Sequence, residues 1–186
     1  HTAGLTVHGF PGYKTGEELP SNTEVLNGEG NTGKVLLDIV PGSKWRYSGG
    51  GYTVMEQLVE DVSKKTFEHY MQEAVLDKLG MENSTYQQPL AKNKWSQASA
   101  AFNRQGEQIK GDWNNYPEQA AAGLWTTPSD LAKYILAIQH ARKGLDDRVI
   151  DQNMTNEMLT MHHDAWGLGP ELTAKPQGLV FSHGGK

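Results

Sequence analysis

The chain has 186 residues, which is enough to bury a core in one domain. Its formal net charge of −5 leaves no basic surface and argues against a nucleic-acid partner. The absence of cysteine excludes disulfides, thiolate metal sites and a cysteine nucleophile. No apolar run approaches the roughly 20 residues that cross a bilayer, so the sequence predicts no membrane span.

The first part of the chain is predicted to be mostly irregular. Residues 1–20 combine glycine and proline with little periodicity and are predicted to be loop. Ser21 can cap a short helix that runs to Leu26, and Asn27-Gly28 is predicted to end it. The apolar run over residues 35–40 is consistent with either a strand or an extended connector.

The stretch from Tyr47 to Gly51 is the most unusual in the chain, because it places three glycines directly before a helical pattern. Consecutive glycines indicate either positive φ or the close approach of another group to the backbone. The helix is predicted to run to about Lys65, with the following residues as its core face: Val54, Met55, Leu58, Val59 and Val62. Tyr47 would then stand at the N-terminus of the helix, where a phenol is a candidate acid or base. The alternative is a plain turn with a packing tyrosine.

A second helix is predicted to begin after Thr66, which can cap it, and to end at Gly80. Its apolar residues share one face and are expected in the core: Phe67, Tyr70, Met71, Ala74, Val75 and Leu79. Residues 82–116 are predicted to be a long polar loop in which Trp95, Phe102 and Trp113 act as anchors. A loop of this length often lines a site, although weak structure is an alternative.

The clearest helix signal begins at Pro128, where Thr127 can cap and Asp130 can complete a capping box. This helix is predicted to run to about Lys143. After it, the sequence predicts a short helix over residues 152–161 and then strands over residues 165–172 and 178–182.

Histidines offer only weak evidence of a metal site. Adjacent residues in an extended segment point to opposite faces, so the run His162-His163-Asp164 is interpreted as a solvated loop. The remaining histidines outside the motifs below are interpreted as surface residues: His1, His8, His69 and His140.

Five short elements occur along the chain in a characteristic order: His1-Thr2-Ala3-Gly4-Leu5, Tyr47-Ser48-Gly49-Gly50-Gly51-Tyr52, Leu79-Gly80-Met81, Ala120 to Ala132, and His183-Gly184-Gly185. Together they resemble the serine β-lactamase and penicillin-binding-protein family, in its class C-like or esterase-like branch. The resemblance spans practically the whole chain. It implies a mainly α fold with a few short strands, the helical subdomain of the β-lactamase/transpeptidase-like α+β fold.

The resemblance also implies a site with three parts: an S-x-x-K serine nucleophile, a motif that begins with tyrosine, and a strand motif of the K-T-G type. Tyr47 matches the tyrosine, which in the family works with the lysine to move the serine proton. His183 begins the third motif, at a position where lysine is commoner. Tyr47 and His183 are therefore the expected catalytic residues, and the expected substrate-binding residues are Ser48, Gly49, Gly184, Gly185 and Lys186, the last through its backbone N–H.

Two departures from the family pattern limit this reading. The third residue of the second motif, often asparagine, is Gly49 here, which fits esterase-like or peptidase-like relatives better than β-lactam turnover. No S-x-x-K occurs, and in the family it lies upstream of the element at residues 1–5. We therefore interpret the chain as one domain over 1–186, truncated at both ends, with 1–164 mostly helical subdomain and 165–186 the start of returning strands.

The parent protein is thus expected to hydrolyse an amide, lactam or ester through an acyl-enzyme, without cofactor or metal, and the isolated chain is expected to be inactive. The alternatives are a non-catalytic domain that binds peptidoglycan-like ligands, and an unrelated helical protein. Export to the periplasm or cell exterior is implied by the resemblance alone. Apolar surface exposed by truncation is expected to permit self-association.

Overall fold

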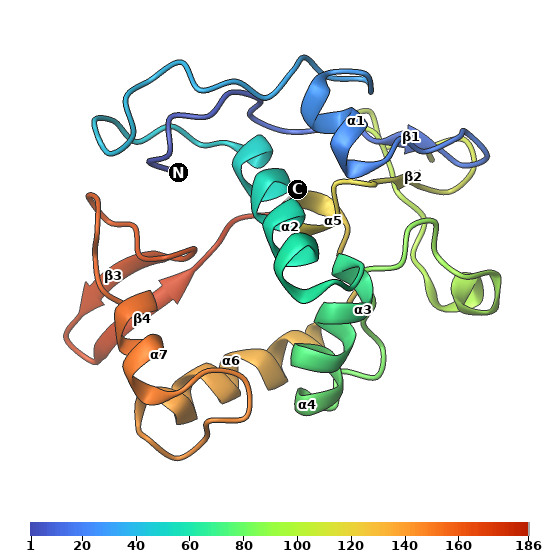
Figure 1. Cartoon of the computed structure of the whole chain (residues 1–186). Helices are drawn as coiled ribbons and strands as arrows, with labels where there is room; N and C mark the ends of the chain where they lie inside the picture. The colour runs from blue at the N-terminus through green and yellow to red at the C-terminus, as the bar shows by residue number, and fades with distance from the viewer. Residues whose placement is uncertain (186) are drawn as a thin grey trace. The chain divides into compact units, whose positions relative to one another are not determined.

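The structure is a computed structural model and describes residues 1–185. It is mainly α with a few short strands, as the sequence predicts (Figure 1). The elements are β1 (Tyr13–Lys14), α1 (Asn22–Asn27), α2 (Gly49–Ser63), α3 (Phe67–Met71), the π-helix η1 (Gln72–Leu76), α4 (Asp77–Leu79), the 3-10 helix η2 (Lys92–Gln97), β2 (Asn114–Asn115), α5 (Gln119–Ala122), α6 (Pro128–Arg142), α7 (Gln152–Met158), β3 (Glu171–Lys175) and β4 (Gly178–Ser182).

The chain forms two compact units. The first contains residues 1–73 and 83–126, and the second contains residues 74–82 and the chain from residue 127 onward. Within the described part of the chain, none of the helices combines the length and the apolar character needed to cross a bilayer.

Helix α1 has the boundaries that its sequence predicts, because both ends carry capping residues. The hydroxyl of Ser21 accepts the N–H of Glu24 at 3.3 Å, while the Glu24 carboxylate accepts the N–H of Ser21 at 2.7 Å. Gly28 ends the helix in the left-handed conformation, at φ 78°. The fully buried Val25 anchors α1 in the first unit.

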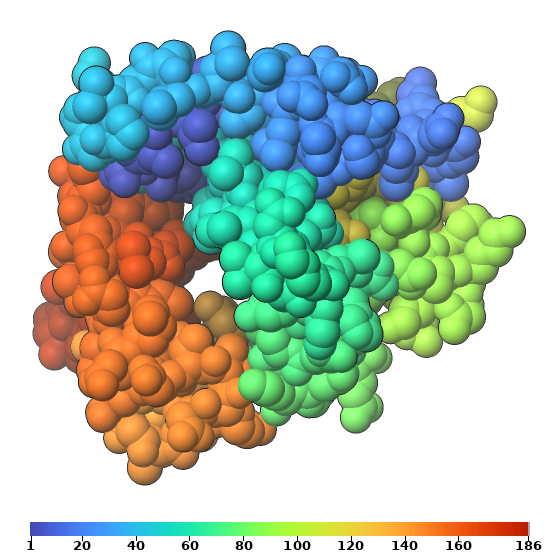
Figure 2. All heavy atoms as spheres, viewed as in Figure 1, coloured from blue at the N-terminus to red at the C-terminus, as the bar shows by residue number. Residues whose placement is uncertain are grey.

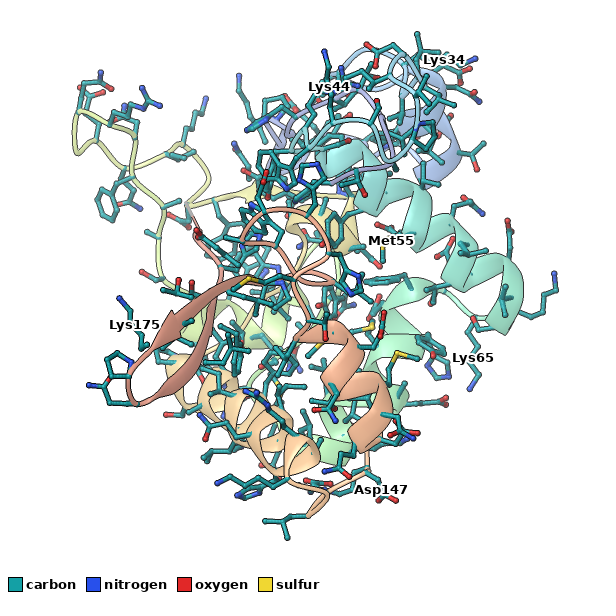
Figure 3. All side chains as sticks on the ribbon, turned by 90° about the vertical axis from the view of Figure 1, so that its left-hand side faces the viewer. Lys34, Lys44, Met55, Lys65, Asp147 and Lys175 are labelled. Atoms are coloured by element: carbon teal, nitrogen blue, oxygen red, sulfur yellow. The ribbon has the colours of Figure 1, made fainter. Side chains whose placement is uncertain are left out.

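Helix α2 forms where predicted, but the prediction of its core face is wrong. The apolar residues of the predicted face are largely exposed, with Val54 at 39%, Leu58 at 60% and Val62 at 75%. Met55, labelled in Figure 3, lies on the same face and is 53% exposed. The buried positions are instead Gly49, Gly50, Thr53 and Glu56. Periodicity locates the helix, but small and hydrogen-bonding residues decide which side packs against α1 and α5.

The second predicted helix is helical throughout, but it consists of α3, the π-helix η1 and α4 in direct succession. Thr66 caps it by accepting the N–H of His69, and Gly80 ends it at φ 63°. The π-helix η1 interrupts it, which the residue pattern does not predict. Phe67 and Leu79 are buried as expected, whereas Tyr70 is 37% exposed, and Leu76, which the prediction leaves out, is buried as well.

The predicted loop over residues 82–116 contains only η2 and β2 as regular elements. Trp113 is its buried anchor, with edge-on ring contacts to Trp95 at 5.8 Å and to Trp125 at 5.3 Å. Phe102 does not anchor it, because this residue sits in a surface turn and is 59% exposed. Strand β2 pairs with β1, with Tyr13 opposite the buried Asn115.

In the second unit, α6 begins and is capped as predicted: the hydroxyl of Thr127 accepts the N–H of Asp130 at 3.2 Å. Ile138 of this helix packs with Leu159 and Leu172 in a buried apolar cluster. Helix α7 ends at Met158, before the predicted residue 161.

The hairpin of β3 and β4 is antiparallel, with Lys175 beside its turn (Figure 3). Strand β4 has its predicted bounds, but β3 begins at Glu171 and not at residue 165. The reason is a tight turn in the preceding segment, where Gly167 donates its N–H to Pro170 at 2.9 Å and Gly169 adopts φ 115°.

Candidate functional site

The N-terminus of α2 is bonded closely to the segment that begins the chain. Ser48 caps the helix: its hydroxyl accepts the N–H of Gly51 at 2.9 Å and donates to the carbonyl of Thr6 at 2.7 Å. The N–H groups of Gly49 and Gly50 donate to the carbonyls of His8 and Val7, each at 3.0 Å. The amide groups at this helix end are therefore bonded within the first unit.

Close approach, not positive φ, explains Gly49 and Gly50, since all three glycines lie inside the helix and a Cβ on Gly51 would make only ordinary contacts, the nearest at 3.6 Å. A Cβ added to Gly50 would lie 2.7 Å from the Thr6 carbonyl oxygen, and one added to Gly49 would lie 3.1 Å from that of His8. In Figure 2 the dark blue atoms of the N-terminal segment lie beside the beginning of α2, in teal, and are partly covered by later residues in lighter blue. Side chains at these two positions would push the segments apart.

Tyr47 directly precedes the N-cap, as the sequence predicts. Its ring lies 4.0 Å from the imidazole of His1, with 36° between the planes, and 4.8 Å from that of His8. The interpretation of His1 as a surface residue is wrong, since it is half-buried, whereas His8 is exposed. The contact between His1 and Tyr47 could have been suspected from the sequence, because the motif at residues 1–5 is one of the five elements that carry the family resemblance.

His1 is surrounded by aromatic rings. Besides Tyr47, the ring of Trp45 lies edge-on at 5.6 Å and that of Tyr52 lies at 5.4 Å. Its Nδ1 accepts the N–H of Ser48 at 3.1 Å. Burial raises the pKa of Tyr52, and the neighbouring phenol of Tyr47 raises it further.

The other predicted motif follows β4 in the second unit. The Nδ1 of His183 lies 2.6 Å from the carbonyl oxygen of Gly184, and its ring lies edge-on to Trp166 at 6.1 Å. His183, Gly184 and Gly185 are exposed, and a Cβ added to either glycine would meet nothing within 4 Å. Lys186 lies outside the described residues.

The residues of the predicted site lie in two groups, one in each compact unit. Tyr47, Ser48 and Gly49 come together at the beginning of α2, and His183 and Gly184 at the end of β4. That both groups belong to one site is what the family resemblance implies, and it stays a prediction.

Two buried carboxyls of the first unit were missed by sequence reasoning. Glu56 is 2% exposed and its Oε2 accepts the N–H of Ala120 at 2.8 Å, beside α5. Burial raises the pKa of Glu56 to about 8, with the charges of Glu60 and Glu118 adding to the effect. Glu118 is fully buried, and burial raises its pKa to about 7. The spacing of Gly49, Thr53 and Glu56 places them on one helix face and could have indicated this arrangement.

The two histidines of the run His162-His163-Asp164 lie close to oxygen atoms of residues nearby in the sequence. The Nε2 of His162 lies 3.0 Å from the carbonyl oxygen of Glu157, and the Nδ1 of His163 lies 3.0 Å from the carboxylate of Asp164. Within residues 1–185, no group of three or more His, Asp or Glu side chains is arranged to hold a metal ion.

Comparison with known proteins identifies the family. A family model described as Beta-lactamase matches residues 1–186, while no curated protein matches the chain. Among solved structures, a penicillin-binding protein from Bacillus halodurans is 19% identical with a TM-score of 0.71, the match covering 96% of this chain and 56% of that one. D-amino acid amidase from Ochrobactrum anthropi SV3, complexed with L-phenylalanine, is 17% identical with a TM-score of 0.73, covering 98% and 54%.

A β-lactamase/D-alanine carboxypeptidase from Pseudomonas syringae is 15% identical with a TM-score of 0.67, covering 95% of this chain and 48% of that one. The chain therefore spans about half the length of these structures. At such identities the likeness extends to the fold alone, and the assignment of family rests on the model that matches residues 1–186. With that match over its whole length, the chain belongs to the beta-lactamase family.

Proposed function

We propose that the parent of this chain is a serine hydrolase that cleaves an amide, lactam or ester through an acyl-enzyme. The observation that carries the proposal is the beginning of α2, where Ser48 of the motif Tyr47-Ser48-Gly49 caps a helix and the phenol ring of Tyr47 lies 4.0 and 4.8 Å from two imidazole rings. The family match supports it, as do the names of the structural neighbours, which include a penicillin-binding protein and an amidase.

In this proposal, the nucleophile is the serine of an S-x-x-K segment upstream of residue 1. Its oxygen attacks the substrate carbonyl, and Tyr47, together with the lysine, takes the serine proton and delivers it to the leaving group. Water then attacks the acyl-enzyme carbonyl, Tyr47 and the lysine take its proton and return it to the serine oxygen, and the acyl–serine bond breaks to release the acid. A phenol has an ordinary pKa of about 10, so it accepts protons near neutrality only beside positive charge. The upstream lysine is the proposed source of that charge.

The strand motif is proposed to hold the substrate. His183 stands where the family more often has lysine, and the open space beside Gly184 and Gly185 leaves room for a substrate against the chain. The backbone N–H of Lys186 is the proposed oxyanion donor, although this residue lies outside the described part of the chain.

The isolated chain is proposed to be inactive, because it contains no S-x-x-K. Incubation of the chain with a fluorescent penicillin or a nitrophenyl ester should give no stoichiometric covalent labelling. The parent, extended upstream by its own gene, should be labelled, and Tyr47→Phe should slow labelling by about a hundredfold or more. Tyr70→Phe is the matched control, because Tyr70 is exposed on α3. Labelling of the isolated chain, or full activity of the Tyr47→Phe parent, would overturn the proposal.

A non-catalytic relative that binds peptidoglycan-like ligands is the second candidate. The observation that favours it is that residues 1–186 contain no S-x-x-K, so this chain alone supplies no nucleophile of that motif. The discriminating observation is the upstream sequence: a serine three residues before a lysine supports the hydrolase, and its absence from the full gene supports the binding domain.

A further inference from the structure

We propose that His1 is a positioning residue for Tyr47, holding both the phenol ring and the residue that caps α2. The inference rests on the proposed function, in which Tyr47 moves the proton. It concerns a side chain that the catalytic motifs leave out.

Contacts on several sides hold the imidazole of His1. Its ring lies 4.0 Å from that of Tyr47, while Trp45 and Tyr52 lie against it at 5.6 and 5.4 Å. Its backbone is fixed as well, because the carbonyl of His1 accepts the N–H of Arg46 at 2.9 Å. Such packing leaves the ring few alternative rotamers, and a fixed ring restricts the phenol that stacks on it.

The hydrogen bond from Ser48 determines which form of His1 can do this. The N–H of Ser48 donates to Nδ1 at 3.1 Å, so that Nδ1 carries no proton and the ring is the neutral tautomer protonated at Nε2. Ser48 follows Tyr47 directly and caps α2. One side chain thus contacts the phenol ring through its face and the adjacent backbone through its nitrogen.

His8 provides an internal comparison. Its ring also lies near Tyr47, at 4.8 Å, but it is exposed, and its bond to α2 comes from its backbone carbonyl. Replacing the side chain of His8 therefore leaves that bond in place. If ring proximity alone positioned Tyr47, the two histidines would be equivalent, whereas the geometry assigns the role to His1.

Two amide substitutions at His1 test whether the position of the hydrogen-bond acceptor matters, or only the presence of a polar side chain. In His1→Asn the amide oxygen stands two bonds from Cβ, as Nδ1 does, and can accept the N–H of Ser48. In His1→Gln the amide atoms stand three bonds from Cβ, where Nε2 was, and the acceptor is misplaced. Amide hydrogen exchange of Ser48 in this chain, followed by NMR, should accelerate about tenfold in His1→Gln and by less than about twofold in His1→Asn and in His8→Asn.

Equal exchange in the Asn and Gln variants, or a Gln variant like the wild type, would overturn the proposal. The ring signals of Tyr47 give a second readout, because they should shift in His1→Gln more than in His8→Asn. Unfolding of both His1 variants, shown by lost amide dispersion, would show a general structural role and would also overturn it.

The consequence for catalysis is measured in the parent protein extended upstream. A residue that orients the proton-transfer group without touching substrate should affect kcat and leave KM unchanged. His1→Gln is expected to lower kcat about tenfold, and His1→Asn to restore most of it. Should Tyr47→Phe leave kcat unchanged, the proposed function fails, whereas the exchange of the Ser48 amide still decides whether His1 holds the turn.

Discussion

The two glycine motifs of the chain differ in how the glycines are used. At the beginning of α2, a Cβ on Gly50 would collide with a backbone carbonyl at 2.7 Å, so glycine is required for packing. At the end of β4, a Cβ on Gly184 or Gly185 would meet nothing. The first motif is thus held by its own unit before any ligand arrives. The second motif is exposed, and no contact within the described chain requires glycine at either of its two positions.

Side chains added at both motifs should have very different effects on stability. Gly50→Val should destabilise the chain by about 3 kcal/mol, because the branched side chain meets both the Thr6 carbonyl and Val35. Gly184→Val should have an effect within about 0.5 kcal/mol. Thermal unfolding measures both, and the first variant should melt roughly 10 °C lower. Equal melting temperatures would show that the contacts at α2 yield easily.

The closely packed motif continues into a buried polar face whose stability should depend on pH. The raised pKa values, about 8 for Glu56 and about 7 for Glu118, mean that the folded chain keeps protons that the unfolded chain releases near its ordinary carboxyl pKa. The contribution of these two carboxyls to stability should therefore be largest at acidic pH, and it should be lost as pH rises from about 4.5 to about 8.

Denaturant titrations at several pH values measure this slope. Glu56→Gln and Glu118→Gln should each reduce it, since an amide carries no proton that the folded state can retain. Glu18→Gln, at an exposed position of the same unit, should leave it unchanged. Stability that rises with pH across this window would contradict the expected sign.

The serine hydroxyls beside the two motifs are expected to differ in the same way. Ser48→Ala removes the cap of α2, together with the bond to the Thr6 carbonyl, and should cost about 1 kcal/mol. Ser182→Ala, at the exposed end of β4, should be neutral within about 0.5 kcal/mol. Urea unfolding midpoints compare the two variants directly, and an equal loss in both would mean that Ser48 is not acting as a cap.

Local signals in the sequence were sufficient for much of the fold. The caps at Ser21, Thr66 and Thr127, and the terminating glycines at residues 28 and 80, act within one helical turn and predict boundaries correctly. Tyr47 was predicted at the N-terminus of a helix for the same reason. These residues determine structure through their nearest neighbours in the chain, so no knowledge of tertiary packing was needed.

Contacts between distant segments could not be predicted in this way. Val7 adopts φ 62°, rare for a β-branched residue, and its carbonyl accepts from Gly50, 43 residues later in the sequence (50 − 7 = 43). The same segment brings His1 to Tyr47. The prediction of which face of α2 is buried is wrong for a related reason. Hydrophobic spacing favours an apolar core face, but Thr53 and Glu56 are the residues that face inward.

The exposed apolar face of α2 is expected to have a small effect, on self-association of the chain. Val54, Leu58 and Val62 stand at i, i+4 and i+8 and form an apolar stripe that favours self-association. We expect the chain to dimerise weakly in sedimentation velocity, and Leu58→Lys to weaken the dimer about fivefold because a charge would be buried in the contact. Glu68→Lys is the control, since Glu68 is exposed on α3 and changes charge without touching the stripe. A monomer at every concentration would show that the apolar stripe does not mediate self-association. The apolar spacing of α2 would then indicate the helix itself and not a contact surface.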